Sequence, residues 1–398
     1  MSEEEIEGAV AEPAADAPVP TEPEATEPEV AEARVTSARQ WVSLRGTSMD
    51  ARVGLHLVDG IGNDMKSVVG RPRACALAVG PSADADAVEA FRRELTSVGF
   101  LVSRVELPGD AGACSLASLG EVLQAFAGIG LTGDDLVMAM GDAYALSLVS
   151  HAAAGWCGGV ALTLVPTDLT AALYAPVTPR PLDVAGFPRL VTRDGMARYE
   201  FCDLGLMEVA GDSESVLLAR ALMVAAAMAD SDKVFERLWD RSEQLVAGDL
   251  DTVATQMADS LRSRGRLVSS TSVAVRQSAA YGMTFTHAVR TLVGDDVPTS
   301  SILADALRFA GRLAVAQGFL GVDDMFAQDE ALDRLGLDTV RCAVDPDQMV
   351  AAIKSERFRT TNRLMLCLPR AIGRVRLTAV DDDLLAEHVG AWCASRGA

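Results

Sequence analysis

The chain has 398 residues, of which 49% are hydrophobic and 23% charged, so it is long enough to bury a sizeable core and to form two or three domains. Its formal net charge of −21 at pH 7 argues against bulk electrostatic binding to nucleic acid or to an anionic membrane surface. The seven cysteines are odd in number, spread over the chain and without a C-x-x-C pair, which indicates reduced thiols in a cytoplasmic protein.

Residues 1–36 are predicted to be a disordered acidic tail. Eleven acids and no Lys or Arg lie in residues 1–33, so the other 365 residues carry a charge of only −10. Such a composition cannot bury enough apolar surface to offset its chain entropy. The segment also lacks the basic start and the long apolar stretch of a signal peptide. We therefore expect a solvating extension, with a role in interactions as the alternative.

Residues 37–205 are predicted to form an α/β domain with a parallel sheet. The expected strands are 74–79, 100–107, 136–140 and 160–165, and the helices between them are 82–98, 116–126 and 143–154. Strands and helices in this order are typical of β-α-β units, in which ligands bind beyond the carboxyl ends of the strands. Residues 37–70 and 184–215 are hard to interpret.

One uncharged stretch, between Asp142 and Asp168, is long enough to span a bilayer. Gly155, Gly158 and Gly159 interrupt it. We therefore expect a buried helix, a glycine-rich turn and a buried strand, and no membrane partner.

Residues 206–398 are predicted to form a mostly helical domain, because the apolar pattern changes to a period of 3.6. The expected helices are 215–230, 233–246, 250–264, 277–293, 301–318, 328–335 and 382–394, with short strands at 364–368 and 375–379. The predicted fold class is thus α/β plus α, with a Rossmann-like parallel-sheet domain followed by a helical domain.

Several short motifs, in their order and spacing, carry a resemblance to a known family. They are VELPG at 105–109, DDLVMAMG at 134–141, VPT at 165–167, Arg276 with GMTFTHA at 282–288, and IG at 372–373. From about residue 74 to the C-terminus, the chain resembles the 3-dehydroquinate synthase family of sugar-phosphate cyclases. The resemblance implies a fold that binds NAD and Zn²⁺ and the shikimate-pathway reaction, the phosphate-eliminating cyclisation of a seven-carbon keto-sugar phosphate.

The resemblance places the NAD-binding residues at Gly141, Asp142, Thr167 and Asp168. The family's turn is rich in glycine, because the backbone must approach a pyrophosphate closely at a helix N-terminus. Here only Gly141 remains, and Asp142 puts a negative charge near the phosphate position. Asp168 stands where the family has a second threonine. We therefore expect no bound NAD.

The family's zinc ligands, one Glu and two His, align with Arg220, Met283 and Thr299. Zinc needs three protein ligands with nitrogen, oxygen or sulfur donors. The chain has only four histidines, too scattered to indicate another site. The sequence therefore predicts no metal.

Four residues keep a charge or a histidine at the family's substrate positions and are the candidate catalytic residues: Arg180, Arg262, Arg276 and His287. Arginine binds phosphate and carboxylate, often through two hydrogen bonds. A phosphorylated or carboxylate small molecule is the expected ligand. The plainer interpretation is that the arginines are solvated surface or helix-end charges and that His287 caps a helix or packs in the core.

We favour a divergent member of the family that has kept the fold and lost the chemistry, a pseudoenzyme. It would act as a binding or partner subunit, in a homodimer or in a heteromer with a family paralogue. Two alternatives stay open. One is an active 3-dehydroquinate synthase with substituted residues, and the other is a metal-free anion-binding enzyme or sensor that uses the same cleft.

Overall fold

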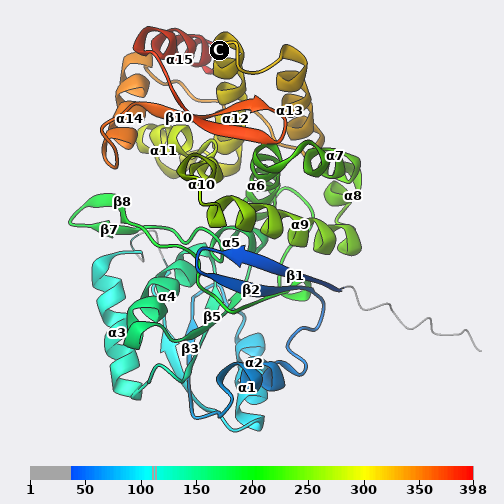
Figure 1. Ribbon diagram of the computed structural model, residues 1–398, viewed down its shortest axis with the longest axis vertical. Coiled ribbons are helices and arrows are strands. Elements are labelled where there is room, and N and C mark those ends of the chain that lie inside the picture. Colours follow the sequence, from blue (N-terminus) through cyan, green and yellow to red (C-terminus); the bar gives the residue numbers. More distant parts are fainter. Residues whose placement is uncertain (1–36, 110–111, 113, 398) are drawn as a thin grey trace, which may run out of the picture. The chain divides into compact units, whose positions relative to one another are not determined.

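The computed structural model describes residues 37–109, 112 and 114–397. The predicted acidic tail, residues 1–36, lies outside them. Strands and helices alternate as far as Asp203, and helices dominate from Glu214 onward (Figure 1). The predicted fold class is confirmed.

Seven strands form one sheet, in the spatial order β1 (Ser37–Leu44), β2 (Thr47–Gly54), β9 (Tyr199–Asp203), β6 (Ala161–Pro166), β5 (Leu136–Gly141), β3 (Ala74–Val79) and β4 (Leu101–Glu106). The first two strands are an antiparallel hairpin. All the other neighbours pair in parallel. The carboxyl ends of six parallel strands, β2, β3, β4, β5, β6 and β9, therefore share one edge, which we call the carboxyl edge.

Helices cover both faces of this sheet. The helices α1 (Ile61–Val69) and α2 (Ala85–Ser97) pack on one face, where Leu77 of β3 and Phe91 of α2 share a core. The helices α3 (Leu116–Ile129), α4 (Ala143–Gly155) and α5 (Leu169–Tyr174) join the core of the other face, with Ala76 and Ala78 of β3. Successive residues of β3 thus point to opposite faces, and both are buried, which explains why this strand has an almost unbroken apolar sequence.

The rest of the chain is mostly helical, apart from two hairpins. Its helices are α6 (Glu214–Asp230), α7 (Asp232–Asp240), α8 (Ser242–Ala247), α9 (Leu250–Ser269), α10 (Val273–Gln277), α11 (Met283–Val293), α12 (Thr299–Ala316), α13 (Val322–Arg334), α14 (Pro346–Phe358) and α15 (Asp382–Arg396). One hairpin joins β7 (Leu182–Val184) to β8 (Phe187–Val191), and the other joins β10 (Met365–Ala371) to β11 (Arg374–Ala379).

Two predicted helices are each divided in the structure. The helix predicted at 233–246 is α7 and α8, separated at Arg241. The helix predicted at 277–293 is a short turn and then α11, because Gly282 has a φ of 81° and breaks the helix. A Cβ at Gly282 would lie 2.8 Å from the side chain of Leu303 and 3.0 Å from that of Leu307. This close approach of α11 to α12 needs glycine there.

Sequence reasoning missed several elements. Residues 37–70 form β1, β2 and α1, and residues 346–358 form α14, which buries only Met349 and Ile353 and so has a weak apolar pattern. The uncharged stretch forms α4, a turn and β6, as predicted. None of the described helices is long and apolar enough to cross a membrane. The predicted domain boundary at 205/206 stays a prediction.

Candidate functional site

Two strand ends at the carboxyl edge lie directly against the first turn of α4. A Cβ at Gly80, just after β3, would lie 2.9 Å from the Cβ of Ala145, and a Cβ at Gly141 would lie 2.8 Å from the same atom. Glycine at both positions lets the helix begin close to the sheet. The N-terminus of α4 is thus a feature of this edge.

Asp142 caps α4. Its Oδ1 accepts hydrogen bonds from the backbone N–H groups of Tyr144, at 3.0 Å, and of Ala145, at 2.9 Å. These are two of the donors that a bound anion would use at a helix N-terminus. The carboxylate therefore occupies them and adds its own negative charge.

The next strand end, after β6, is built in the same way. Asp168 caps α5 by accepting from Ala171 N at 2.8 Å, and it accepts a second hydrogen bond from the Ser215 hydroxyl at 3.3 Å. Burial raises the pKa of Asp168, and the neighbouring Asp142 charge raises it further. Thr167 shares a hydrogen bond of 2.8 Å with Ser82. The four residues predicted from the NAD motif, Gly141, Asp142, Thr167 and Asp168, therefore follow or end adjacent strands.

Arg180 is held beside these strand ends. Its guanidinium donates to the backbone oxygens of Cys114, at 3.4 Å, and of Pro181, at 3.0 Å. It also pairs with Asp183 at 3.1 Å and lies over the ring of Tyr144. These contacts with three neighbouring residues and one ring fix the position of the guanidinium.

The β7–β8 hairpin connects this region to α14. Asp183 accepts from the backbone N of Arg189 at 2.8 Å, and Arg189 has a φ of 57°, which is unusual for a residue with a side chain. The Arg189 Nη2 then donates to Glu356 Oε2 at 2.8 Å. An ion pair between residues 167 positions apart therefore joins the hairpin to the helical part.

His287 and Glu356 form a pair. His287 Nδ1 lies 3.0 Å from Glu356 Oε1, and Arg359 Nη1 donates to Glu356 Oε2 at 2.6 Å. Burial by itself would raise the pKa of Glu356, but its hydrogen bonds with His287 and Arg189 and the charge of Arg189 outweigh burial and lower that pKa to about 2. Glu356 is therefore ionised at neutral pH.

His287 is neutral at this pH. Burial lowers its pKa, and the charges of Arg189 and Arg180 lower it further, against the opposing effect of Glu356. An ionised carboxylate can only accept hydrogen bonds. His287 Nδ1 therefore carries the ring proton and donates a hydrogen bond to Glu356. Its Nε2 is then left with a lone pair, which could accept a proton or a hydrogen bond.

Arg264 is a buried cation without a carboxylate partner among the described residues. Its Nη2 donates to the Thr178 hydroxyl at 2.6 Å, its guanidinium lies over the ring of Tyr174, and its Nε has no hydrogen-bond partner. Burial lowers the pKa of Arg264 to about 10, so it stays charged at neutral pH. The Arg264, Arg180 and Arg189 charges all act on Tyr174.

We call these residues the carboxyl-edge cluster: Tyr144, Tyr174, Arg180, Arg189, Arg264, His287 and Glu356. Sequence reasoning had selected only Arg180 and His287 as site residues. The sequence did contain a hint that Arg264 is a site residue. It lies on the same side of α9 as the apolar residues Leu261 and Val268. A charged residue on an apolar helix face is uncommon unless it has a role. Arg189 gave no such signal.

The other two arginines of the prediction make local contacts. Arg262 pairs with Asp259 at 2.6 Å on its own helix. Arg276 donates to the backbone oxygens of Ser270, at 2.7 Å, and Thr271, at 3.0 Å. Neither contact involves the carboxyl-edge cluster.

The positions aligned with the family's zinc ligands have other contacts. Arg220 is buried and donates to the backbone oxygens of Leu335 and Leu245, each at 3.3 Å. Met283 and Thr299 are the first residues of α11 and α12. Across the described ranges, no three His, Cys, Asp or Glu side chains are grouped so that they could hold a metal ion.

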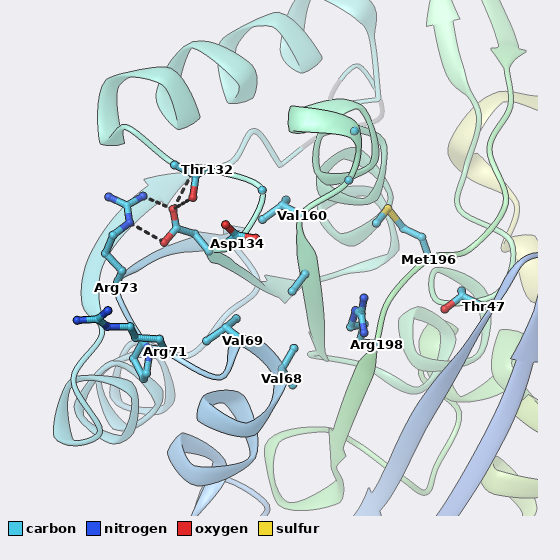
Figure 2. A pocket seen from close by; sticks show the side chains of 16 residues that line it. Thr47, Val68, Val69, Arg71, Arg73, Thr132, Asp134, Val160, Met196 and Arg198 are labelled. Atoms are coloured by element: carbon cyan, nitrogen blue, oxygen red, sulfur yellow. Dashed lines mark hydrogen bonds and ion pairs between the residues drawn. The ribbon is translucent and has the colours of Figure 1, made fainter.

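A large hollow lies at the opposite, amino edge of the sheet. Its volume is about 990 Å³, and Arg71, Arg73, Asp134, Asp135 and Arg198 are among its lining residues. Arg73 Nε donates to Asp135 at 3.0 Å, and Asp135 also accepts from the backbone N of Thr132 at 2.7 Å. Figure 2 shows Arg73 and Thr132 at one side of this hollow. The side chains of Arg71 and Arg198 have no partner in the part of the chain that the structure describes. None of the predicted site residues lines this hollow.

Sequence comparison finds 3-dehydroquinate synthases among the relatives of this chain. No family model matches the chain. A 3-dehydroquinate synthase of Corynebacterium jeikeium is 22% identical over 318 residues, which is 79% of this chain and 85% of the relative. A 3-dehydroquinate synthase of Nocardia farcinica is 27% identical over 313 residues, or 76% of this chain and 82% of the relative. The resemblance found in the motifs is thus confirmed over about three quarters of the chain.

Solved structures of sugar-phosphate cyclases share the fold. A 2-deoxy-scyllo-inosose synthase in complex with carbaglucose-6-phosphate, NAD⁺ and Co²⁺ has a TM-score of 0.77 at 15% identity, covering 88% of this chain and 99% of that one. The 2-epi-5-epi-valiolone synthase of Streptomyces hygroscopicus with NAD⁺ and Zn²⁺ has a TM-score of 0.74 at 16% identity, with coverage of 89% and 99%. A 1,3-propanediol oxidoreductase is more distant, with a TM-score of 0.61 at 15% identity and coverage of 88% and 99%.

Proposed function

We propose that this chain is a diverged protein of the sugar-phosphate cyclase fold that does not catalyse the NAD- and zinc-dependent synthase reaction and that acts as a binding or partner subunit. The observation that carries the proposal is the cap of α4. Asp142 already accepts from Tyr144 N and Ala145 N. A dinucleotide pyrophosphate at this helix would have to displace the carboxylate or lie beside its negative charge.

The donor set at the aligned zinc positions also supports the proposal. Arg220 is a cation whose guanidinium is used by backbone oxygens, and it cannot ligate a metal ion. The ring nitrogen Nε2 of His287 could ligate a metal ion. Its neighbour Glu356 is held by hydrogen bonds from His287, Arg189 and Arg359 instead. The residues present therefore do not fit the metal that the family uses, and we derive no catalytic step through NAD or zinc.

The test is binding and turnover with the purified full chain. We expect no rise in melting temperature with NAD⁺ or Zn²⁺, and no phosphate release from the seven-carbon keto-sugar phosphate. A ligand that binds only the native state adds about 2.7 kcal/mol to its stability when present at 100 times its Kd, so binding would be readily detected. The Nocardia farcinica 3-dehydroquinate synthase, assayed in parallel, is the positive control. Phosphate release above the no-enzyme rate would instead establish the alternative of an active synthase.

The partner would be a second copy of this chain or an active paralogue, which would place the protein beside the shikimate pathway in the cytoplasm. Light scattering after gel filtration measures the mass of the chain alone and of the chain mixed with the paralogue. A dimer mass in either sample is expected. A monomer in both samples would contradict the role of a partner subunit.

A second candidate function is a metal-free anion site, as an enzyme or a sensor. Arg264 favours it, because a buried guanidinium with an unpartnered Nε and no carboxylate partner in the described ranges makes its surroundings electropositive. Arg180 and Arg189 add positive charge, and His287 Nε2 could accept a proton from a bound hydroxyl group. A phosphorylated or carboxylate ligand would complement these charges.

Its test is the melting temperature with phosphorylated sugars and dicarboxylates. A shift that Arg189→Gln reduces, while the matched exposed variant Arg104→Gln does not, would support the anion site. The absence of a shift, or an equal loss in both variants, would exclude it.

A further inference from the structure

A second cationic site lies in the helical part, away from the carboxyl-edge cluster. It is a hollow of about 230 Å³ between α12 and α15. Its lining residues are Arg308, Phe309, Arg312, His388, Ala391, Trp392, Ser395 and Arg396. The lining thus contains three guanidinium groups, an imidazole and a hydroxyl, and it contains no carboxylate.

Buried contacts hold one of these guanidinium groups in place. Arg396 forms two hydrogen bonds with Asp305, at 2.6 and 3.0 Å. Asp305 is fully buried and also accepts from Trp392 Nε1 and from the backbone N of Val340, each at 3.2 Å. Because the carboxylate lies behind the hollow and is saturated, Arg396 is positioned before any ligand arrives.

The other two arginines are anchored from outside the lining in the same way. Arg308 pairs with Asp333 at 2.6 Å and donates to the backbone oxygen of Leu337 at 2.8 Å. Arg312 pairs with Asp329 at 2.8 Å. The three arginines therefore present a rigid set of donors from two packed helices.

Arg308 has a spare donor. The residue is only 4% exposed, and its Nη1 is buried without a hydrogen-bond partner and lies 4.0 Å from a carboxylate oxygen of Asp305. Leaving a buried charged donor unpaired is costly, so an acceptor oxygen that reached this nitrogen would be stabilised by a charge-assisted hydrogen bond. The imidazole of His388 also has no partner among the residues that the structure describes.

We propose that this hollow binds a compact phosphate-type oxyanion, either inorganic phosphate or the phosphoryl group of a small monoester. Guanidinium groups from three residues suit an anion with several acceptor oxygens, and arginine is the usual partner of phosphate where geometry matters. The volume corresponds to roughly eight water molecules at about 30 Å³ each, which leaves room beside the phosphate for a small organic group. Phe309, Ala391 and Trp392 give that group an apolar wall.

The experiment is calorimetric titration of the full chain with inorganic phosphate and, separately, with glycerol 3-phosphate. We expect saturable binding of one equivalent of at least one of them, and a change in tryptophan emission that Trp392→Phe removes. Arg312→Gln should weaken binding about tenfold or more, because it removes a charge-assisted hydrogen bond. Tighter binding of the ester would identify a monoester as the ligand, and tighter binding of phosphate would identify the free ion.

Arg92→Gln is the matched control. Arg92 and Arg312 are equally exposed, with 44% and 45% of their side-chain surface accessible, and each pairs with one carboxylate. Arg92→Gln should bind phosphate like the wild type, and both variants should keep the unfolding midpoint within a few degrees. Equal weakening by both variants would show unspecific attraction and overturn the proposal.

Two further outcomes would also overturn it. One is the absence of saturable binding of either probe. The other is a loss of binding in Arg189→Gln without a loss in Arg312→Gln, because the anion would then bind at the carboxyl-edge cluster. This last result would support the second candidate function, so the two proposals can fail separately.

Discussion

The two edges of the parallel sheet satisfy their charges in different ways. At the carboxyl edge, Asp142 and Asp168 cap the helices that follow, and Glu356 is shared by His287, Arg189 and Arg359. At the amino edge, a hollow of about 990 Å³ stays open, and no described residue pairs with Arg71 or Arg198 (Figure 2).

Parallel sheets normally bind their ligands at the carboxyl edge, where helix N-termini and loops meet. In this protein that edge is already occupied by its own carboxylates and arginines. The comparison teaches that side chains of the same chain can cap the helices at one edge of a sheet, while arginines at the other edge have no partner among the described residues. It also predicts that removing the shared carboxylate of Glu356 from the carboxyl edge costs far more than removing an unpaired charge from the amino edge.

The largest effect is expected for Glu356→Ala. This change leaves His287, Arg189 and Arg359 without their shared carboxylate in a largely buried place, which should lower the free energy of unfolding by about 3–5 kcal/mol. Urea denaturation at pH 7 measures it, with the exposed Glu243→Ala as the control. Since the folded pKa of Glu356 is lowered to about 2, its contribution is present above the ordinary carboxyl pKa of about 4.3 and is lost as the pH falls toward 2. Equal stability of the two variants at pH 7 would disprove this role.

A stabilising effect is expected for Glu200→Leu, in the middle of the sheet. Glu200 is fully buried on β9, both carboxylate oxygens lack a hydrogen-bond partner, and burial raises its pKa well above the ordinary value. A raised folded pKa means that the wild type loses stability as the pH rises above about 4.3, by about 1.4 kcal/mol per pH unit until the folded group ionises. The variant should therefore gain about 1–4 kcal/mol at pH 7 and little at pH 4.

Urea denaturation at several pH values checks this prediction. A gain that does not depend on pH would point to better packing of leucine alone. A loss of stability at pH 7 would show that the carboxylate has a partner in the folded protein.

A smaller effect is expected for Asp142→Ala. Loss of the α4 cap should cost about 1 kcal/mol in thermal or urea unfolding. It also frees Tyr144 N and Ala145 N, so inorganic pyrophosphate should raise the melting temperature of this variant more than that of the wild type. Asp84→Ala is the matched control, because Asp84 caps α2 in the same way, accepting from Ala87 N at 2.9 Å. If pyrophosphate raised the melting temperatures of both variants equally, the N-terminus of α4 would have no special affinity for anions.

The smallest effect is expected for one arginine at the amino edge, Arg198. Arg198→Ala should change the free energy of unfolding by no more than about 0.5 kcal/mol, because its side chain is exposed and has no partner among the described residues. Arg73→Ala, in the same hollow, leaves the buried Asp135 without its ion pair and should cost about 1–3 kcal/mol. Urea unfolding measures both costs. Equal costs for the two variants would contradict the distinction between a paired arginine, Arg73, and an unpaired one, Arg198.

Part of the site could be predicted from the sequence. The glycine-ended strands and the charge of Asp142 are local features, so the position of the carboxyl edge and the negative charge that lies there could be predicted from the sequence. Arg180 and His287 were found through the resemblance. The role of Glu356 was not accessible, because its partners Arg189 and His287 lie 167 and 69 positions away.

The sequence by itself determined the alternating strands and helices between residues 74 and 165 and the resemblance to 3-dehydroquinate synthases, because periodicity, glycine turns and short motifs depend on neighbouring residues. Only the tertiary structure decided which charges meet. Packing between segments far apart in the chain decides three features. They are the burial of Arg264 and Arg308, the carboxylate that holds Arg396, and the point where α7 and α8 separate. Free energies of ion pairing and burial arise from such contacts, and local sequence patterns do not specify them.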